Sequence, residues 1–307
     1  MSGALTLQFT TQAQADIKRM TSQLSDLQRQ VASGAKANDL QGFGGSVSLL
    51  LNTQSLRATA DAQTSAINQV VSRFGVQASA LEQVAGGITN LANSIRNSVS
   101  SDDGRSISVD LSLAFSSAVS GLNETWNGQP LFAGQRTTGN GPVTISTLDQ
   151  LAATPTAQIF DEAANLQTFQ LGSGPPIALA DKASTMSSAL FDTLRQLKNM
   201  LDAAGGDLGS PLTAQQKSQL AQIATQLDGE ASTFTNEEGK AGQLESRFNS
   251  EASRLTDRSN LLVKEIGSQS DADLAMVSVQ ISSLETQYQA AAKTFSDLSK
   301  LTLLAYL

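Results

Sequence analysis

Residues that could carry out catalysis are few in this sequence. Ser33 and Lys36 have the Ser-x-x-Lys spacing that pairs a serine nucleophile with a lysine, but neither Lys-Thr-Gly nor Ser-Asp-Asn accompanies them. Because Gly34 lies between the two, we interpret this segment as a turn that ends a helix. The sequence contains no cysteine and no histidine, which excludes thiol catalysis, Ser-His triads and the usual zinc sites. We therefore predict a protein that is not an enzyme and uses no cofactor.

Two acidic pairs could serve as metal ligands or catalytic acids. Asp102 and Asp103 precede a glycine, as in calcium-binding turns, but the residues that follow lack the spaced acids of a calcium loop. We interpret this pair as a solvated turn. Asp271 and Asp273 have the residue types of a catalytic acid pair, yet they stand at a predicted helix start, where carboxylates are favoured without any chemistry.

Composition and charge limit the classes of partner. Hydrophobic residues make up 40% of the 307-residue chain and aromatic residues 5%, while small residues that let helices approach closely are abundant. The net charge is −8 and no basic cluster exceeds Lys18-Arg19, so we expect no nucleic-acid partner. No apolar stretch reaches membrane-spanning length, and the first residues lack the features of a secretory signal. We expect no membrane partner, and either a cytoplasmic location or export without a cleavable signal.

The closing stretch, residues 271–307, carries the clearest structural pattern. Its apolar residues recur in alternating steps of three and four, a heptad repeat that predicts a helix lying along another helix. Ser270 and Asp273 have the spacing of a capping box and predict where this helix starts. The last residues are the most apolar part, which indicates a surface that a partner covers.

The opening stretch shows the same spacing until Ser33-Gly34 breaks it. Two heptad segments at opposite ends of one chain suggest that the ends pair with each other or with further copies. An ordinary buried helix pair would give the same pattern. The candidate assembly interface consists of Ile17, Met20, Leu24, Leu27, Val31, Leu274, Val277, Ile281, Leu284, Tyr288, Phe295, Leu298, Leu301, Leu304 and Leu307.

Long helices are predicted between these two ends. The apolar spacing predicts a helix from about residue 46 to 101, then a shorter one through residues 109–122. Helix returns near residue 181 and stops at Gly205-Gly206, and a last central helix follows Pro211. Glycine joints at residues 42–45 and 267–268 separate the terminal segments from the rest.

Residues 127–180 differ from the rest of the chain in composition. This window holds five of the six prolines, several glycine turns and short apolar pieces between them. We interpret it as a small β-rich insertion. Trp126, the sole tryptophan, could mark a sugar site, but beside a turn it is better explained as a packing anchor. The predicted short strands are residues 131–133, 143–145, 158–160 and 168–171.

The predicted fold is mainly α: an elongated long-helix bundle with paired N- and C-terminal coiled-coil helices and a small β-rich insertion. Three domains are predicted. Residues 1–42 with 270–307 form a terminal coiled coil, residues 43–126 with 181–269 form a long-helix bundle, and residues 127–180 form the insertion.

Three segments carry a family resemblance. Residues 284–295 (Leu-Glu-Thr-Gln-Tyr-Gln-Ala-Ala-Ala-Lys-Thr-Phe) and 298–307 form a characteristic tail, without the Ala-Asn-Gln stretch expected of flagellin. Residues 30–36 contain a Ser-Gly joint, and residues 127–134 contain a Leu-Phe-Ala-Gly turn that opens the insertion. The segments resemble the flagellin superfamily and, within it, the hook–filament junction proteins (third of the hook-associated proteins).

This resemblance implies a non-catalytic structural protein of the bacterial flagellum that self-assembles through its terminal helices. Its implied partners are further copies of itself, the preceding hook-associated protein, flagellin and a flagellar export chaperone. The implied location is extracellular, reached by type III export without a cleavable signal peptide. The alternatives are flagellin itself and, from another class, a secreted glycan-binding module that uses Trp126 or Phe132 of the insertion.

The terminal helices are expected to order only on assembly. A lone helix pair buries one narrow stripe of each helix, so the free pair would be marginally stable. Neighbouring copies would cover the outward side and supply the missing burial.

Overall fold

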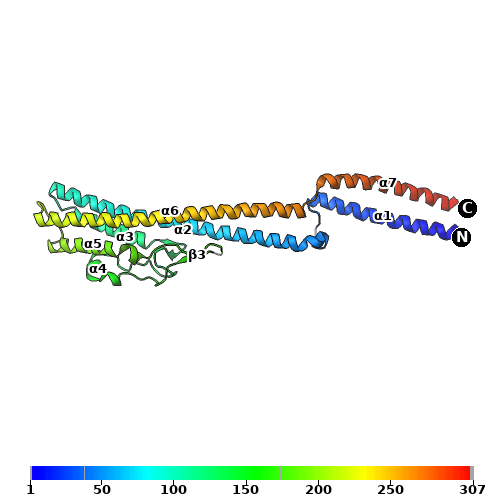
Figure 1. Cartoon of the computed structure of the whole chain (residues 1–307). Helices are drawn as coiled ribbons and strands as arrows, with labels where there is room; N and C mark the ends of the chain where they lie inside the picture. Colours follow the sequence, from blue (N-terminus) through cyan, green and yellow to red (C-terminus); the bar gives the residue numbers. More distant parts are fainter. Residues whose placement is uncertain (1, 38, 173, 305–307) are drawn as a thin grey trace. The chain divides into compact units, whose positions relative to one another are not determined.

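The computed structural model describes residues 2–37, 39–172 and 174–304, with side chains described between residues 11 and 297. The protein is mainly α-helical, as predicted (Figure 1). The strands are short: β1 (Thr125–Trp126), β2 (Gln129–Pro130), β3 (Thr168–Gln170) and β4 (Pro176–Ala178). The helices are α1 (Ser2–Ser33), η1 (Gln41–Ser46), α2 (Val47–Ser101), α3 (Ile107–Leu122), α4 (Leu148–Ala153), η2 (Thr156–Gln158), α5 (Ala183–Ala203), α6 (Ala214–Ser270) and α7 (Leu274–Leu304).

The chain divides into two compact units. The terminal unit comprises Met1–Gln63 and Arg254–Leu307, and the central unit comprises Thr64–Ser253. The long helices α2 and α6 each contribute residues to both units. The three-domain division made from the sequence stays a prediction.

The core of the central unit forms between α2, α3, α5 and α6. The apolar stripe predicted along the first long helix is the α2 contribution to this core, because residues at helical spacing fall on one face. α5 ends at Gly205-Gly206 as predicted, four residues after Leu201, the last buried leucine of that helix. The fully buried members of the cluster include Leu81, Ile88, Ile95, Leu111, Leu122, Phe191, Leu227 and Phe234.

Glycines allow α2 and α3 to approach closely. A Cβ on Gly121 would lie 2.6 Å from Val84 Cγ2 and 2.7 Å from the Ala80 carbonyl oxygen. A Cβ on Gly87 would lie 2.7 Å from the Ser117 Cβ. Such distances are below van der Waals contact, so larger residues at these two positions would push the helices apart.

The insertion contains two small antiparallel hairpins. Thr125–Trp126 pairs with Gln129–Pro130 around a two-residue turn, and β3 pairs with β4. The predicted strand at residues 168–171 is confirmed over β3. The predicted strand at residues 131–133 is wrong, because this buried segment turns and packs into the core; residues 143–145 and 158–160 contribute one isolated bridge, between Val143 and Phe160.

The break predicted at residues 42–45 is confirmed. It lies in η1, where Gly44 adopts φ 54° and ψ −128°, a conformation that favours glycine. The joint predicted at residues 267–268 is wrong, because α6 continues through it to Ser270. An isolated glycine is tolerated inside a helix, at a cost of about 1 kcal/mol relative to alanine.

The capping box predicted at Ser270 is also wrong. Ser270 is the last residue of α6, and Asp273 is the residue that caps α7. Its Oδ1 accepts hydrogen bonds from the backbone N–H groups of Ala275 and Met276, both at 3.1 Å. The aspartate therefore supplies the acceptor that the first turn of α7 requires.

A buried aromatic cluster joins α2, α6 and β3. Phe248 of α6 contacts the edge of Phe74 of α2, with ring centroids 5.5 Å apart and planes at 72°. The Phe248 ring also lies 5.5 Å from that of Phe169 in β3. Phe74 and Phe248 are completely buried. The cluster thus holds the second hairpin of the insertion on the long helices.

Replacing Phe248 with alanine should lower the free energy of unfolding of the central unit by about 3–5 kcal/mol, because the change leaves a cavity beside the Phe74 and Phe169 rings. Chemical denaturation followed by circular dichroism measures this loss. Leu113→Ala is the matched control, since the Leu113 side chain is 62% exposed in the same unit. Equal stability of the two variants would show that the cluster does not stabilise this unit.

Candidate assembly interface

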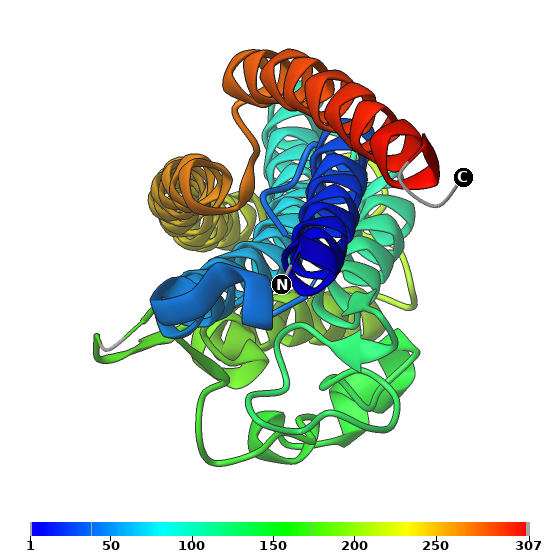
Figure 2. The same ribbon diagram turned by 90° about the vertical axis from the view of Figure 1, so that its right-hand side faces the viewer.

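The helices α1 and α7 form an antiparallel pair in the terminal unit. They lie side by side in both views, α1 in blue and α7 in orange to red (Figures 1 and 2). The sequence predicted this pairing of the two ends. In the part of the pair whose side chains are described, Val277 alone among the apolar residues is buried.

The structure brings most of the predicted interface residues together along this pair. Val31, Leu274 and Tyr288 are exposed, so the pair leaves part of the predicted stripe uncovered. The side chains of Leu298, Leu301 and Leu304, and the whole of Leu307, lie outside the described residues. Half-buried between the helices are Ile17, Met20, Leu24, Leu27, Ile281, Leu284 and Phe295.

A backbone clasp fixes the base of the pair. Ala35 and Asp271 form an isolated antiparallel bridge. The Ala272 N–H donates to the Gly34 carbonyl at 2.8 Å, and the Lys36 N–H donates to the Ser270 carbonyl at 2.7 Å. We call these residues, 34–36 and 270–272, the clasp. They connect the end of α1 to the start of α7 through main-chain hydrogen bonds.

The clasp also accounts for the Ser-x-x-Lys spacing. The Ser33 hydroxyl donates to the Arg29 carbonyl at 2.8 Å, and Lys36 Nζ donates to the Ser268 carbonyl at 2.7 Å. Gly34 ends α1 with φ +69°, and its N–H donates to the Gln30 carbonyl at 2.8 Å. The segment is therefore a helix-ending turn, as predicted.

A groove of about 380 Å³ runs between α1 and α7. Leu27 and Leu284 are its apolar residues, and both are half-buried. Its one charged residue, Asp26, forms an ion pair with Arg29 on the same helix. The remaining lining residues are Gln23, Gln280, Ser283 and Gln287.

Exposed apolar side chains are concentrated in the terminal unit. Of the thirteen large hydrophobic side chains that are exposed in the described part of the chain, eleven belong to this unit. The two others are Val109 and Leu113 on α3. Such a concentration of exposed apolar side chains in one unit favours association of that unit with another protein.

Charge is distributed just as unevenly. The terminal unit has ten basic and ten acidic residues and is therefore neutral. The central unit has ten basic and eighteen acidic residues, so it carries the whole net charge of −8. Copies of the central unit repel one another, whereas terminal units can pack together without accumulating charge.

The acidic pairs of the sequence have structural partners. Asp102 accepts from the Leu212 N–H and pairs with Lys217, and this hydrogen-bonded ion pair lowers the Asp102 pKa. Hydrogen bonds from the Arg105 side chain and backbone lower the Asp103 pKa to about 2. Within the described residues, no three acidic side chains converge as metal ligands would.

Sequence patterns carried no signal for Arg73, a buried cation on α2. Its Nη2 donates to the Leu131 carbonyl at 2.9 Å and to Gln167 Oε1 at 3.0 Å. Desolvation lowers the Arg73 pKa to about 10, so the side chain stays charged at neutral pH. Arg73 therefore fastens two segments of the insertion to α2 and plays a structural part.

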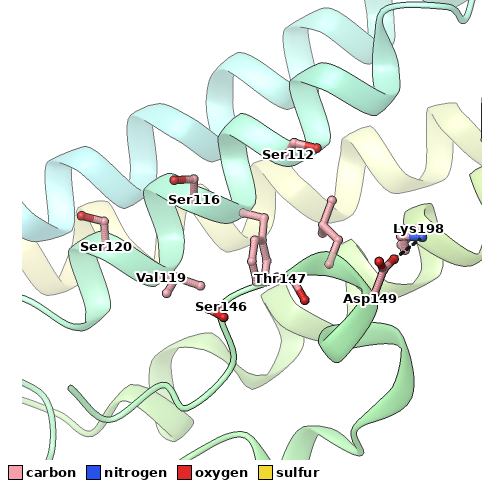
Figure 3. Close-up of a pocket in the computed structure, with 10 residues that line it drawn as sticks. Ser112, Ser116, Val119, Ser120, Ser146, Thr147, Asp149 and Lys198 are labelled. Atoms are coloured by element: carbon pink, nitrogen blue, oxygen red, sulfur yellow. Dashed lines mark ion pairs between the residues drawn. The ribbon is translucent and has the colours of Figure 1, made fainter. Parts of the chain in front are cut away.

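A second groove, of about 580 Å³, lies in the central unit between α3 and α4 (Figure 3). Ser112, Ser116 and Ser120 line one side of it at four-residue spacing. Lys198 lies at its edge but already forms ion pairs with Asp149 and Asp202. The groove thus offers hydroxyl groups without an unpaired charge.

The aromatic residues suggested for glycan binding pack in or against the hydrophobic core. Phe132 is 1% exposed within the core cluster, and Trp126 packs against the same cluster. A sugar ring needs an open aromatic face, so the geometry does not favour this use of the insertion. The interpretation of Trp126 as a packing anchor agrees with its position. In the described part of the chain, no helix is long and apolar enough to cross a membrane.

Comparison with known proteins identifies the type of fold. Residues 224–307 match the family model of the bacterial flagellin C-terminal helical region. A flagellar hook-associated protein of Vibrio parahaemolyticus is similar in structure, with a TM-score of 0.57, 11% identity, and coverage of 75% of this chain and 98% of the other. FlgL of Bacillus cereus gives a TM-score of 0.53 and 12% identity over 70% of this chain and 96% of its own. No curated protein sequence matches the chain.

Replacing Gly34 with alanine should weaken the clasp. The substitution forces a Cβ into the left-handed region, at a cost of about 1 kcal/mol, although no atom lies within 4 Å of the new Cβ. Amide hydrogen exchange at Lys36 and Ala272, the two clasp donors, should accelerate roughly fivefold. Gly45→Ala is the control, because that glycine has equal space and no left-handed φ. Unchanged exchange in Gly34→Ala would contradict the role of the clasp.

Proposed function

We propose that this protein of the flagellin superfamily, a flagellar structural protein of the flagellin and hook-associated type, forms the junction between a hook-associated protein and the flagellin filament. It does so by self-assembly through α1 and α7. The observation that carries the proposal is the uncovered apolar surface of the terminal unit. This surface includes α7, which lies inside the region that matches flagellin.

The proposed mechanism is burial of the terminal pair by neighbouring copies. Each large apolar side chain that becomes fully covered, such as Leu274 or Tyr288, contributes roughly 1.5–3 kcal/mol. The neutral charge of the terminal unit permits this dense packing, because no like charge accumulates at the contact. The central unit, with its own core and its net charge, stays in contact with water.

The same surface explains the other proposed partners. Before assembly, an export chaperone covers the apolar side of α7 and keeps it from aggregating. The protein reaches the outside of the cell through the flagellar type III apparatus without a cleavable signal. In the assembled flagellum, the terminal pair contacts the preceding hook-associated protein on one side and flagellin on the other.

Replacing Leu274 with glutamate should abolish filament growth without unfolding the monomer. The side chain is 47% exposed, so the monomer tolerates the change, but a charge in a covered contact is costly. The assay is electron microscopy of filaments in cells whose own copy is deleted, with export measured in parallel. Leu113→Glu, at a site 62% exposed in the central unit, is the matched control. Normal filaments with Leu274→Glu would count against the proposal.

Flagellin is the second candidate function, because the matching family model is that of flagellin. The two functions differ in how assembly ends. A filament subunit added to filament seeds should extend them for as long as free protein remains. A junction protein should add a shallow layer and stop, and seed length measured by electron microscopy distinguishes the two outcomes.

A further inference from the structure

Two Asn-Gly pairs lie in loops of the central unit, at Asn127-Gly128 and Asn140-Gly141. This pair of residue types supports a spontaneous reaction. The backbone nitrogen of the glycine attacks the side-chain carbonyl carbon of the asparagine, a C–N bond forms, and the amide leaves as ammonia with the N–H proton. Water then opens the cyclic imide at either carbonyl, which gives aspartate or isoaspartate. Glycine favours the first step because it has no Cβ to shield the nitrogen.

The surroundings of the two glycines differ, although both asparagines are exposed. Among the described residues outside its chain neighbours, no atom lies within 4 Å of the position that a Cβ on Gly128 would take. Asn127 and Gly128 have φ angles of 50° and 74°, as in a type I′ turn, and this turn closes a hairpin with two residues in each strand. So short a hairpin is weak, and its Pro130 has no N–H to donate, so the turn opens at little cost.

The peptide between Asn140 and Gly141 is held in place. A Cβ on Gly141 would overlap the Asn123 side chain, so the glycine packs closely against that side chain. Asn123 is itself fixed by two hydrogen bonds, because its Oδ1 accepts from the Val143 N–H at 2.8 Å and its Nδ2 donates to the Val143 carbonyl at 3.0 Å. Arg136 Nη2 donates to the carbonyls of Asn140 at 2.8 Å and Gly141 at 3.1 Å. Cyclisation turns this peptide group, so it requires these contacts to break first.

We propose that Asn127 is a site of spontaneous deamidation in the folded protein and that the fold protects Asn140. The same residue pair differs in reactivity because one peptide group is free to turn and the other is held. The reaction consumes water, releases ammonia and adds a negative charge at neutral pH. It needs no enzyme, and it takes place within the central unit, so it does not depend on the assembly proposed above.

Peptide mapping by mass spectrometry tests the site during incubation of the full-length protein at mildly alkaline pH. In the folded protein, Asn127 should convert roughly tenfold faster than Asn140 or more, because cyclisation at Asn140 first breaks hydrogen bonds. In denaturant the two sites should convert at similar rates, since the fold no longer separates them. Equal rates in the folded protein, or the same difference in denaturant, would overturn the proposal.

A variant tests the protection of Asn140 directly. Arg136→Gln removes the hydrogen bonds to the carbonyls of Asn140 and Gly141, so the rate at Asn140 should rise severalfold while the rate at Asn127 stays the same. Arg105→Gln is the matched control, because Arg105 pairs with Asp103 elsewhere in the same unit. An unchanged rate at Asn140 in Arg136→Gln would overturn the protection.

Trp126 fluorescence tests the effect of the reaction on the hairpin. The main chain of isoaspartate is one atom longer than that of asparagine, so a two-residue turn no longer keeps Trp126 opposite Gln129. Trp126 packs against the hydrophobic core and is the sole tryptophan of the sequence. The isolated isoaspartate form should therefore emit at longer wavelength than Asn127→Asp, which carries the same charge on an unaltered main chain. Equal emission from the two would overturn this effect.

Discussion

Two helices packed side by side can bury only one stripe of each, and this limit governs the terminal unit. Among the described side chains of α1 and α7, Val277 is the one apolar residue that is buried, while the other heptad residues are half-buried or exposed. The central unit is different, because α2, α3, α5 and α6 enclose side chains such as Ile88 and Phe234 completely. One unit thus has its own core, whereas the helix pair of the other unit buries little apolar surface.

The charge distribution follows the same division. A surface that packs against copies of itself must avoid net charge, since repulsion grows with every neighbour added. The terminal unit meets this condition with ten charges of each sign, and several of them pair locally, as Asp16 does with Arg19. The central unit carries the excess of acidic residues, so copies of this unit repel one another. The distribution of exposed apolar residues and the distribution of charge therefore distinguish the two units in the same way.

The sequence predicted the helices and their buried faces well, because apolar spacing reports directly on which side of a helix is covered. The predictions from the sequence were wrong at residues whose type is compatible with two different local structures. Gly267 lies inside α6 although glycine usually marks a break, and Ser270 ends a helix although its spacing to Asp273 suggested a cap. Arg73 was missed because its partners, Leu131 and Gln167, are distant in the sequence. The exposed side chains of Met276 and Val279 were missed because these residues lie off the heptad stripe.

The clasp explains how the terminal pair can vary its surface without losing its geometry. Its hydrogen bonds run between main-chain groups of residues 34–36 and 270–272, so the side chains along α1 and α7 do not have to fix where the helices meet. Main-chain bonds of this kind are indifferent to side-chain identity, apart from the glycine that the left-handed φ at residue 34 favours. The outward residues of the pair are then free to suit a neighbour. The proposed junction function, in which one helix pair contacts two different neighbours, requires that separation between geometry and recognition.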